Sequence, residues 1–163
     1  MQQVHPFPPV VDAGCRTLIL GSFPSVKSRE NAFYYGHPQN RFWRMLAGVF
    51  AEAVPGSIAE KEALLLRHGI ALWDVIAQCE ITGSSDASVE NAVPVDIARV
   101  TAVAPIERVI CNGALAAKLY RKHLLPRTGI QAIAAPSTSP ANAAWSLERL
   151  TAEWRRLLAP DDP

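Results

Sequence analysis

Short apolar runs alternate along the chain with longer segments whose apolar residues recur at helical spacing. The runs typical of buried strands lie at 17–22, 70–76, 108–111 and 129–134. Helical patterns separate these runs, and we predict helices at 41–53, 57–69, 96–103, 114–123 and 145–158. The second helix is delimited by a capping box of Ser57 with Glu60 and by a stop at Gly69. Alternating strands and helices indicate an α/β fold with a parallel sheet covered on both faces.

The two ends of the chain depart from this alternation. Pro6, Pro8 and Pro9 predict an extended N-terminal arm over residues 1–14, and the closing PDDP predicts a frayed tail over 159–163. The chain contains no internal repeat, and 163 residues are enough to bury a full core. We therefore predict a single domain spanning 1–163.

Composition narrows the class of protein. Hydrophobic residues make up 49% and charged residues 19%, with a net charge of only +1. Contact with nucleic acid would therefore depend on a local patch of the surface. The start of the chain lacks the features of a signal peptide, and no apolar run approaches the roughly 18–20 residues that span a bilayer. We expect a cytoplasmic protein with no membrane contact.

The cysteines and the other metal-binding residue types argue against a bound metal. Cys15, Cys79 and Cys111 are widely separated, which is typical of reduced thiols and not of a zinc or iron–sulfur site. No HExxH motif, paired histidines or clustered carboxylates are present. We expect neither a metal nor a cofactor.

In a parallel α/β sheet the ligand site lies beyond the carboxyl ends of the strands. We call this side of the predicted sheet its carboxyl edge. The segments that follow the predicted strands are polar or rich in glycine and proline: GSFPS at 21–25, Trp73-Asp74, CNG at 111–113 and APSTSP at 135–140. The sequence therefore predicts a binding site at the carboxyl edge.

The first of these segments, GSFPS, combines a glycine with a proline. Gly21 would let the backbone approach a ligand closely, and Pro24 would stiffen the turn. A strand-to-helix turn without a ligand explains the same residues. The segment is neither a nucleotide P-loop nor a nucleophile elbow, since GxxxxGK[ST] and GxSxG are both absent.

The last of these segments, PSTSP at 136–140, offers hydroxyls and backbone amides to phosphate oxygens. Its candidate phosphate-binding residues are Ser137, Thr138 and Ser139. The alternative is a helix entry with Asn142 as N-cap. The two interpretations are compatible, because a capped helix start itself attracts anions.

The segment FYYGHPQNRFW, at 33–43, gathers aromatic and polar residues after the first strand. Tyr35 could stack on a nucleobase or be half-buried in the core. His37 with Pro38 could form a turn around a structural histidine, and Asn40 could be no more than the N-cap of the next helix. We assign Phe42 and Trp43 to the core face of that helix.

Two polar residues end predicted strands. Asp74 follows a buried strand, so its carboxylate needs a partner: a backbone group to cap, a ligand or a base. Asn112 precedes Gly113 and could be simply a turn residue.

Taken together, GSFPS, FYYGHPQNRFW and PSTSPAN resemble motifs of the uracil-DNA glycosylase superfamily, over Leu18 to about Trp154. The combination is most similar to the hypoxanthine-DNA (deoxyinosine) glycosylase branch, while HPQNRFW is also similar to the mismatch-specific uracil/thymine branch. The resemblance implies a three-layer α/β/α fold around a four-stranded parallel sheet of order 2-1-3-4. It also implies a monomeric, monofunctional glycosylase, without metal, that flips a deaminated base out of double-stranded DNA.

The resemblance also implies roles for individual residues. Asn40 would be the catalytic residue, orienting water or holding the base. The base pocket would be formed by Gly21, Ser22, Phe23 and Pro24, with Tyr35 stacked on the base. From their own positions in the sequence, we add His37 and Asp74 to this pocket. The DNA contacts would come from Ser25, Ser137, Thr138 and Ser139, with Pro140 and Ala141 in the loop that penetrates the duplex.

This chain departs from the family pattern at two places. Ser22 and Phe23 stand where much of the superfamily carries a catalytic Asp or Asn, which is why we assign catalysis to Asn40. Ala135 precedes the last motif, where the most active uracil enzymes have a His. No Lys lies within these motifs to form a Schiff base, so strand cleavage is not expected.

Three other functions remain open from sequence. A mismatch-specific glycosylase acting on G:U or G:T pairs and a catalytically weak lesion-binding module would share the same fold. A small-molecule α/β enzyme would need a base beside Ser22 or Ser137, and the sequence provides no convincing His partner for either.

Overall fold

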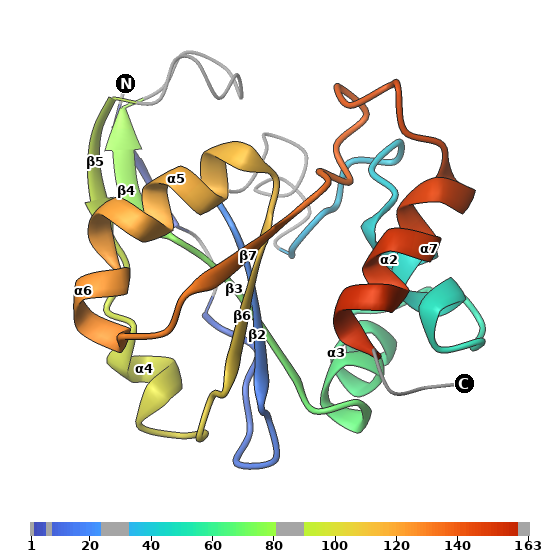
Figure 1. Cartoon of the computed structure of the whole chain (residues 1–163), viewed down its shortest axis with the longest axis horizontal. Helices are drawn as coiled ribbons and strands as arrows, with labels where there is room; N and C mark the ends of the chain where they lie inside the picture. The colour runs from blue at the N-terminus through green and yellow to red at the C-terminus, as the bar shows by residue number, and fades with distance from the viewer. Residues whose placement is uncertain (1, 6–7, 24–32, 81–89, 160–163) are drawn as a thin grey trace.

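The computed structural model describes residues 2–5, 8–23, 33–80 and 90–159. Its centre is a four-stranded parallel sheet of order β3-β2-β6-β7 (Figure 1). The strands are β2 (Thr17–Gly21), β3 (Ile70–Asp74), β6 (Arg108–Asn112) and β7 (Ala132–Ala135). Numbered along the chain, this order is 2-1-3-4, which confirms the prediction.

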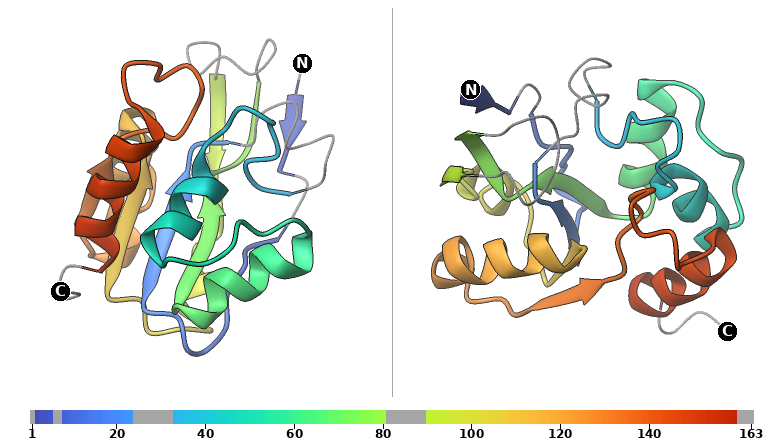
Figure 2. Two further views of the ribbon diagram at one scale, coloured as in Figure 1. Left: turned by 90° about the vertical axis from the view of Figure 1, so that its right-hand side faces the viewer. Right: turned by 90° about the horizontal axis from the view of Figure 1, so that it is seen from above.

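Helices cover both faces of this sheet and complete three layers (Figures 1 and 2). One face carries α2 (Phe42–Val49), α3 (Ile58–Arg67) and α7 (Leu147–Leu158). The other carries α4 (Ala98–Thr101), α5 (Ala114–His123) and α6 (Leu125–Thr128). Because both faces are covered, every residue of β2 and β3 is buried, as their continuous apolar sequences predict.

Helices α2 and α7 pack together over one face of the sheet, and each helix buries a large aromatic side chain between them. Phe42 and Trp154 are fully buried, and their rings meet edge to face at 6.3 Å. Trp43 is 6% exposed, so the predicted core role of Phe42 and Trp43 is confirmed.

A second, antiparallel sheet lies beside the first, and the sequence did not predict it. It has the order β1-β4-β5, from β1 (Gln2–Val4), β4 (Ile76–Glu80) and β5 (Glu90–Pro94). Only Val75 separates β3 from β4, so the apolar run 70–76 contains parts of two strands that belong to different sheets.

Several element boundaries differ from the predictions for local reasons. The helix predicted at 41–53 ends at Val49, and Ala51 has a left-handed φ of 54°. The first part of the run 129–134 is no strand, because Gly129 (φ 70°) ends α6. The N-cap of α7 is Ser146, whose Oγ accepts from the Arg149 amide, and not Asn142. The cap at Ser57 is confirmed by its bond from the Glu60 amide.

Some predictions fall outside the described residues, namely those for Pro24, Ser25 and the tail beyond residue 159. Within the described ranges, no helix combines the length and apolarity needed to cross a membrane.

The burial of β2 predicts a difference in stability between two matched substitutions. Ile19 in β2 is fully buried, whereas Ile133 in the edge strand β7 is 37% exposed. Ile19→Val should lower the free energy of unfolding by about 1 kcal/mol, because one buried methyl group is lost. Ile133→Val should lower it by much less. Urea denaturation of both variants tests this, and equal losses would contradict the burial assigned to β2.

Candidate functional site

Thr138 joins two asparagines at the carboxyl edge of the parallel sheet. The Asn112 side chain, at the end of β6, accepts from the Thr138 amide and donates to Thr138 Oγ1, both at 3.0 Å. Thr138 Oγ1 in turn donates to Asn40 Oδ1 at 2.9 Å. Thr138 is fully buried, so these bonds are shielded from water.

This network fixes which way the Asn40 amide points. Thr138 Oγ1 uses its proton on Asn40, because it already accepts from Asn112. Asn40 Oδ1 also accepts from the Phe42 amide at 2.9 Å, at the start of α2. Oδ1 therefore faces the protein, and Nδ2 makes no hydrogen bond to any other described residue. The N-cap of α2 is Arg41 and not Asn40, although Asn40 Oδ1 accepts from the first helical amide. The Asn40 Nδ2 remains available as a donor.

Arg41 holds the loop that contains Thr138. Its amide donates to the Thr138 carbonyl at 3.1 Å. Its guanidinium donates to the carbonyls of Ser139 (2.9 Å), Asn142 (3.0 Å) and Trp145. We predicted no role for Arg41 from the sequence, although it directly follows Asn40 in the segment FYYGHPQNRFW. The loop 136–146 and the Asn40 segment therefore form one unit.

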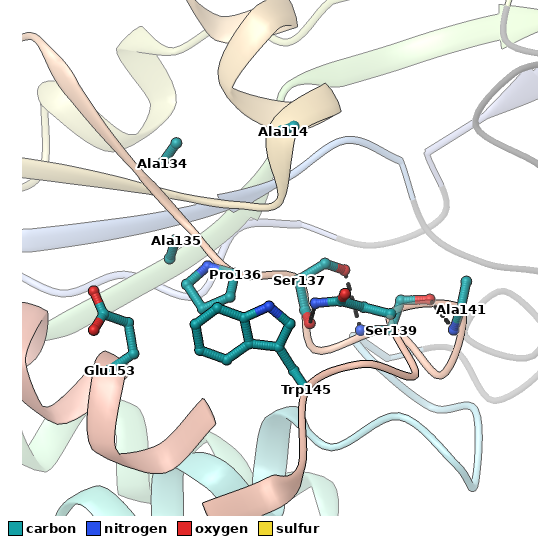
Figure 3. A pocket seen from close by; sticks show the side chains of 10 residues that line it. Ala114, Ala134, Ala135, Pro136, Ser137, Ser139, Ala141, Trp145 and Glu153 are labelled. Carbon is teal, nitrogen blue, oxygen red and sulfur yellow. Dashed lines mark hydrogen bonds between the residues drawn. The ribbon is translucent and has the colours of Figure 1, made fainter. Parts of the chain in front are cut away.

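The same loop is also folded by its own side chains (Figure 3). Ser137 Oγ accepts from the Ser139 amide, and Ser139 Oγ accepts from the Ala141 amide, both at 3.1 Å. The Asn142 side chain donates to the Ser137 carbonyl at 2.9 Å. Each serine hydroxyl keeps its own proton for donation to a ligand.

A hollow of about 650 Å³ lies beside this loop. Its lining includes Ser137, Ser139 and the Trp145 ring (Figure 3). Thr138 lies on the buried side of the loop, and its amide, hydroxyl and carbonyl are all bonded within the protein. Ser137 and Ser139 can therefore make the phosphate contact that we predicted for this loop. Thr138 cannot, because all its polar groups are already bonded within the protein.

Tyr35 is partly buried and has a strained backbone conformation. Its φ is 56°, which is unfavourable for a residue with a bulky side chain and is tolerated mainly at functional sites. Its ring stacks on Phe42 at 4.2 Å, and its hydroxyl is buried without a hydrogen-bond partner among the described residues. Burial raises the pKa of the Tyr35 hydroxyl above its ordinary value, with the Asp74 charge adding to the shift. The hydroxyl is therefore neutral.

Asp74 ends β3 and is paired with His5. His5 Nε2 lies 2.8 Å from Asp74 Oδ2, and both side chains are only 5% exposed. The carboxylate that we expected to need a partner therefore has one, from the N-terminal arm. We predicted no role for His5 from the sequence, because no local signal links two residues 69 positions apart.

Asp74 Oδ1 points toward Gly21 and makes no hydrogen bond to any other described residue. A Cβ added to Gly21 would lie 2.3 Å from this oxygen and 3.1 Å from the Tyr35 hydroxyl. Gly21 therefore lets Asp74 and Tyr35 converge on the end of β2.

The other predicted site residues that the structure describes lie near Asn40, Asp74 or the loop 136–146. His37 forms a turn, in which its Nδ1 accepts from the Gln39 amide and its carbonyl from the Asn40 amide. The Phe23 ring meets His5 edge to face at 5.9 Å, and the Ser22 carbonyl accepts from the Ile76 amide. Pro140 and Ala141 form a turn in the loop 136–146, where the Ala141 side chain is exposed.

Possible metal ligands and thiols are the remaining reactive side chains to be placed relative to this site. Among the described residues, no three His, Cys, Asp or Glu side chains are grouped to hold a metal ion. Cys111 precedes Asn112 and is fully buried, and burial raises the pKa of its thiol to about 12. The thiol is therefore protonated and a poor nucleophile.

The close contacts around Gly21 predict that a side chain added there destabilises the protein. Gly21→Ala should lower the free energy of unfolding by about 1–3 kcal/mol, because the new methyl group overlaps the Asp74 carboxylate. Gly56→Ala is the matched control, because a Cβ there meets nothing within 4 Å. Thermal denaturation measures both, and equal stability of the two variants would refute the close contact of Gly21 with Asp74.

The chain is similar in sequence and in structure to known proteins. A family model described as the uracil DNA glycosylase superfamily matches residues 8–159. A Methanosarcina acetivorans protein named hypoxanthine DNA glycosylase is 35% identical over 149 residues, which are 91% of this chain and 93% of the relative. A protein of the same name from Methanosarcina barkeri is 37% identical over 86 residues, 52% of this chain and 54% of the relative. The solution NMR structure of a candidate uracil DNA glycosylase from M. acetivorans matches with a TM-score of 0.81 and 31% identity, over 97% of each chain.

Proposed function

Because this chain belongs to the uracil DNA glycosylase superfamily, we propose that it is a monofunctional DNA glycosylase that excises a deaminated base from double-stranded DNA. Hypoxanthine is the preferred substrate and uracil the second, in line with the names of two relatives. The observation that carries the proposal is the fixed orientation of Asn40, whose Nδ2 is an open donor at the carboxyl edge. The enzyme would act as a cytoplasmic monomer without metal or cofactor.

The reaction breaks the bond between the sugar C1′ and the base nitrogen. The bonding electrons leave with the base, positive charge develops on the sugar, and a water oxygen bonds to C1′ and releases a proton. Asn40 Nδ2 donates to the departing base or to the attacking water. A neutral donor held rigidly stabilises the separating charges without reorganising during the reaction.

The base would lie between Tyr35 and the end of β3. The face of the Tyr35 ring that is not covered by Phe42 would stack on the base. Asp74 Oδ1 is an open acceptor, and hypoxanthine and uracil each carry a ring N–H that can donate to it. Adenine and cytosine have a lone pair at the corresponding ring nitrogen, so Asp74 would repel both undamaged bases.

The DNA backbone would be held by the loop 136–146. Ser137 and Ser139 would donate their hydroxyl protons to phosphate oxygens, and Pro140 with Ala141 would enter the duplex from the adjacent turn. A local contact of this kind is compatible with a net charge of +1. Because flipping costs only a few kcal/mol, and least for a mispaired base, a deaminated base would be extruded most easily.

Duplex oligonucleotides with a single inosine, uracil, xanthine or mismatched thymine test this proposal. We expect release of hypoxanthine to be fastest, followed by uracil, with alkali-labile abasic sites as the product. Asn40→Ala should reduce excision by at least about a hundredfold, as loss of a catalytic electrostatic donor does, while DNA binding persists.

Two results would contradict this proposal. Binding of the lesions without any abasic product would support a lesion-binding module instead. Faster release of uracil or thymine from G:U or G:T pairs than of hypoxanthine would support a mismatch-specific enzyme.

A further inference from the structure

The N-terminal strand brings a histidine into the candidate site. The family match begins at residue 8, so His5 lies outside the segment that defines the superfamily. It nevertheless contacts Asp74, the carboxylate that our proposed function places against the base. The inference that follows rests on that proposed function.

Backbone pairing holds the segment around His5 on both sides. β1 pairs with β4 up to Val4, and the His5 amide donates to the Ala77 carbonyl at 2.7 Å. Further along, Val10 and Leu72 exchange two backbone hydrogen bonds of 2.9 Å. Between them, the Tyr34 hydroxyl donates to the Pro8 carbonyl at 2.8 Å. His5 is therefore placed by a fixed backbone.

Among the described residues, the aromatic side chains of Phe23, Tyr34 and Trp73 contact the imidazole ring. The centroid of the imidazole lies 5.9 Å from that of the Phe23 ring, 5.8 Å from that of Tyr34 and 6.5 Å from that of Trp73. These contacts restrict rotation of the imidazole and direct Nε2 at Asp74 Oδ2. A carboxylate oxygen can only accept, so Nε2 carries the proton in this hydrogen bond.

The hydrogen bond from His5 decides which carboxylate oxygen remains open. With Oδ2 bonded to His5, Oδ1 is the oxygen that lies toward Gly21 and Tyr35. The Tyr35 hydroxyl is a buried donor without a partner among the described residues, close to the same point. Without His5, the buried carboxylate would lose its donor and would be free to rotate toward Tyr35.

We propose that His5 is a positioning residue for base recognition: its Nε2–H holds Asp74 so that Oδ1 accepts the ring N–H of hypoxanthine or uracil. The N-terminal arm is thereby part of the active site. Loss of the His5 imidazole removes the alignment of Asp74 and leaves Asn40, Thr138 and the loop 136–146 unchanged.

His5→Ala, His5→Gln and wild-type protein test this inference by single-turnover excision of hypoxanthine at saturating enzyme. We expect His5→Ala to lose about tenfold or more in excision rate, as for one lost hydrogen bond to a charged group, with little change in DNA affinity. His5→Gln should retain most of the rate, because its Nε2 can donate from nearly the same position. Added imidazole should restore part of the rate of His5→Ala.

His123→Ala is the matched control, because His123 is the last residue of α5, at the end of that helix away from the carboxyl edge. It should excise at the wild-type rate. Circular dichroism and the fraction of active sites, from burst amplitudes, correct each rate for unfolded protein.

The inference is overturned if His5→Ala excises at the wild-type rate, or if neither imidazole nor His5→Gln restores the rate lost by folded His5→Ala. These outcomes leave the proposed function standing, because wild-type protein still releases the base. Failure of wild-type protein to release any base would instead overturn the proposed function and, with it, this inference.

Discussion

The hydrogen bonds from Asn112 through Thr138 to Asn40 connect the three segments that make up half of the candidate site. Asn112 is fixed by the central sheet. The network therefore holds the loop 136–146 and the start of α2 in place relative to β6. Arg41 adds bonds to the same loop. The Asn40 Nδ2 donor is held in one orientation because the Asn40 Oδ1 accepts two hydrogen bonds within the protein.

The other half of the site is organised around the end of β2. Gly21 leaves room for the Tyr35 hydroxyl and for Asp74, and His5 bonds to the far side of that carboxylate. Stacking of Tyr35 on Phe42 connects the two halves, because the Phe42 amide also donates to Asn40. Polar groups from the parallel sheet, the N-terminal arm, the segment before α2 and the loop 136–146 therefore meet at one carboxyl edge.

Local sequence signals were sufficient for the parallel sheet and for most of its helices. The cap at Ser57 and the burial of Phe42 depend on residues a few positions away, and both were predicted. The contacts that complete the site join residues far apart in sequence: Asn40 and Thr138 are 98 positions apart, and His5 and Asp74 are 69 apart. Nothing in the residues around His5 indicates its partner, because β1 acquires its place only by pairing with β4.

The single-turnover excision rate of Thr138→Val tests most directly whether this hydrogen-bond network orients Asn40. Valine keeps the shape of the buried side chain and removes only the hydroxyl between Asn112 and Asn40. We expect a loss of about tenfold or more in the rate for hypoxanthine in folded protein, with DNA affinity largely retained, because Asn40 loses its orientation. An unchanged rate would contradict the claim that this network positions the catalytic amide.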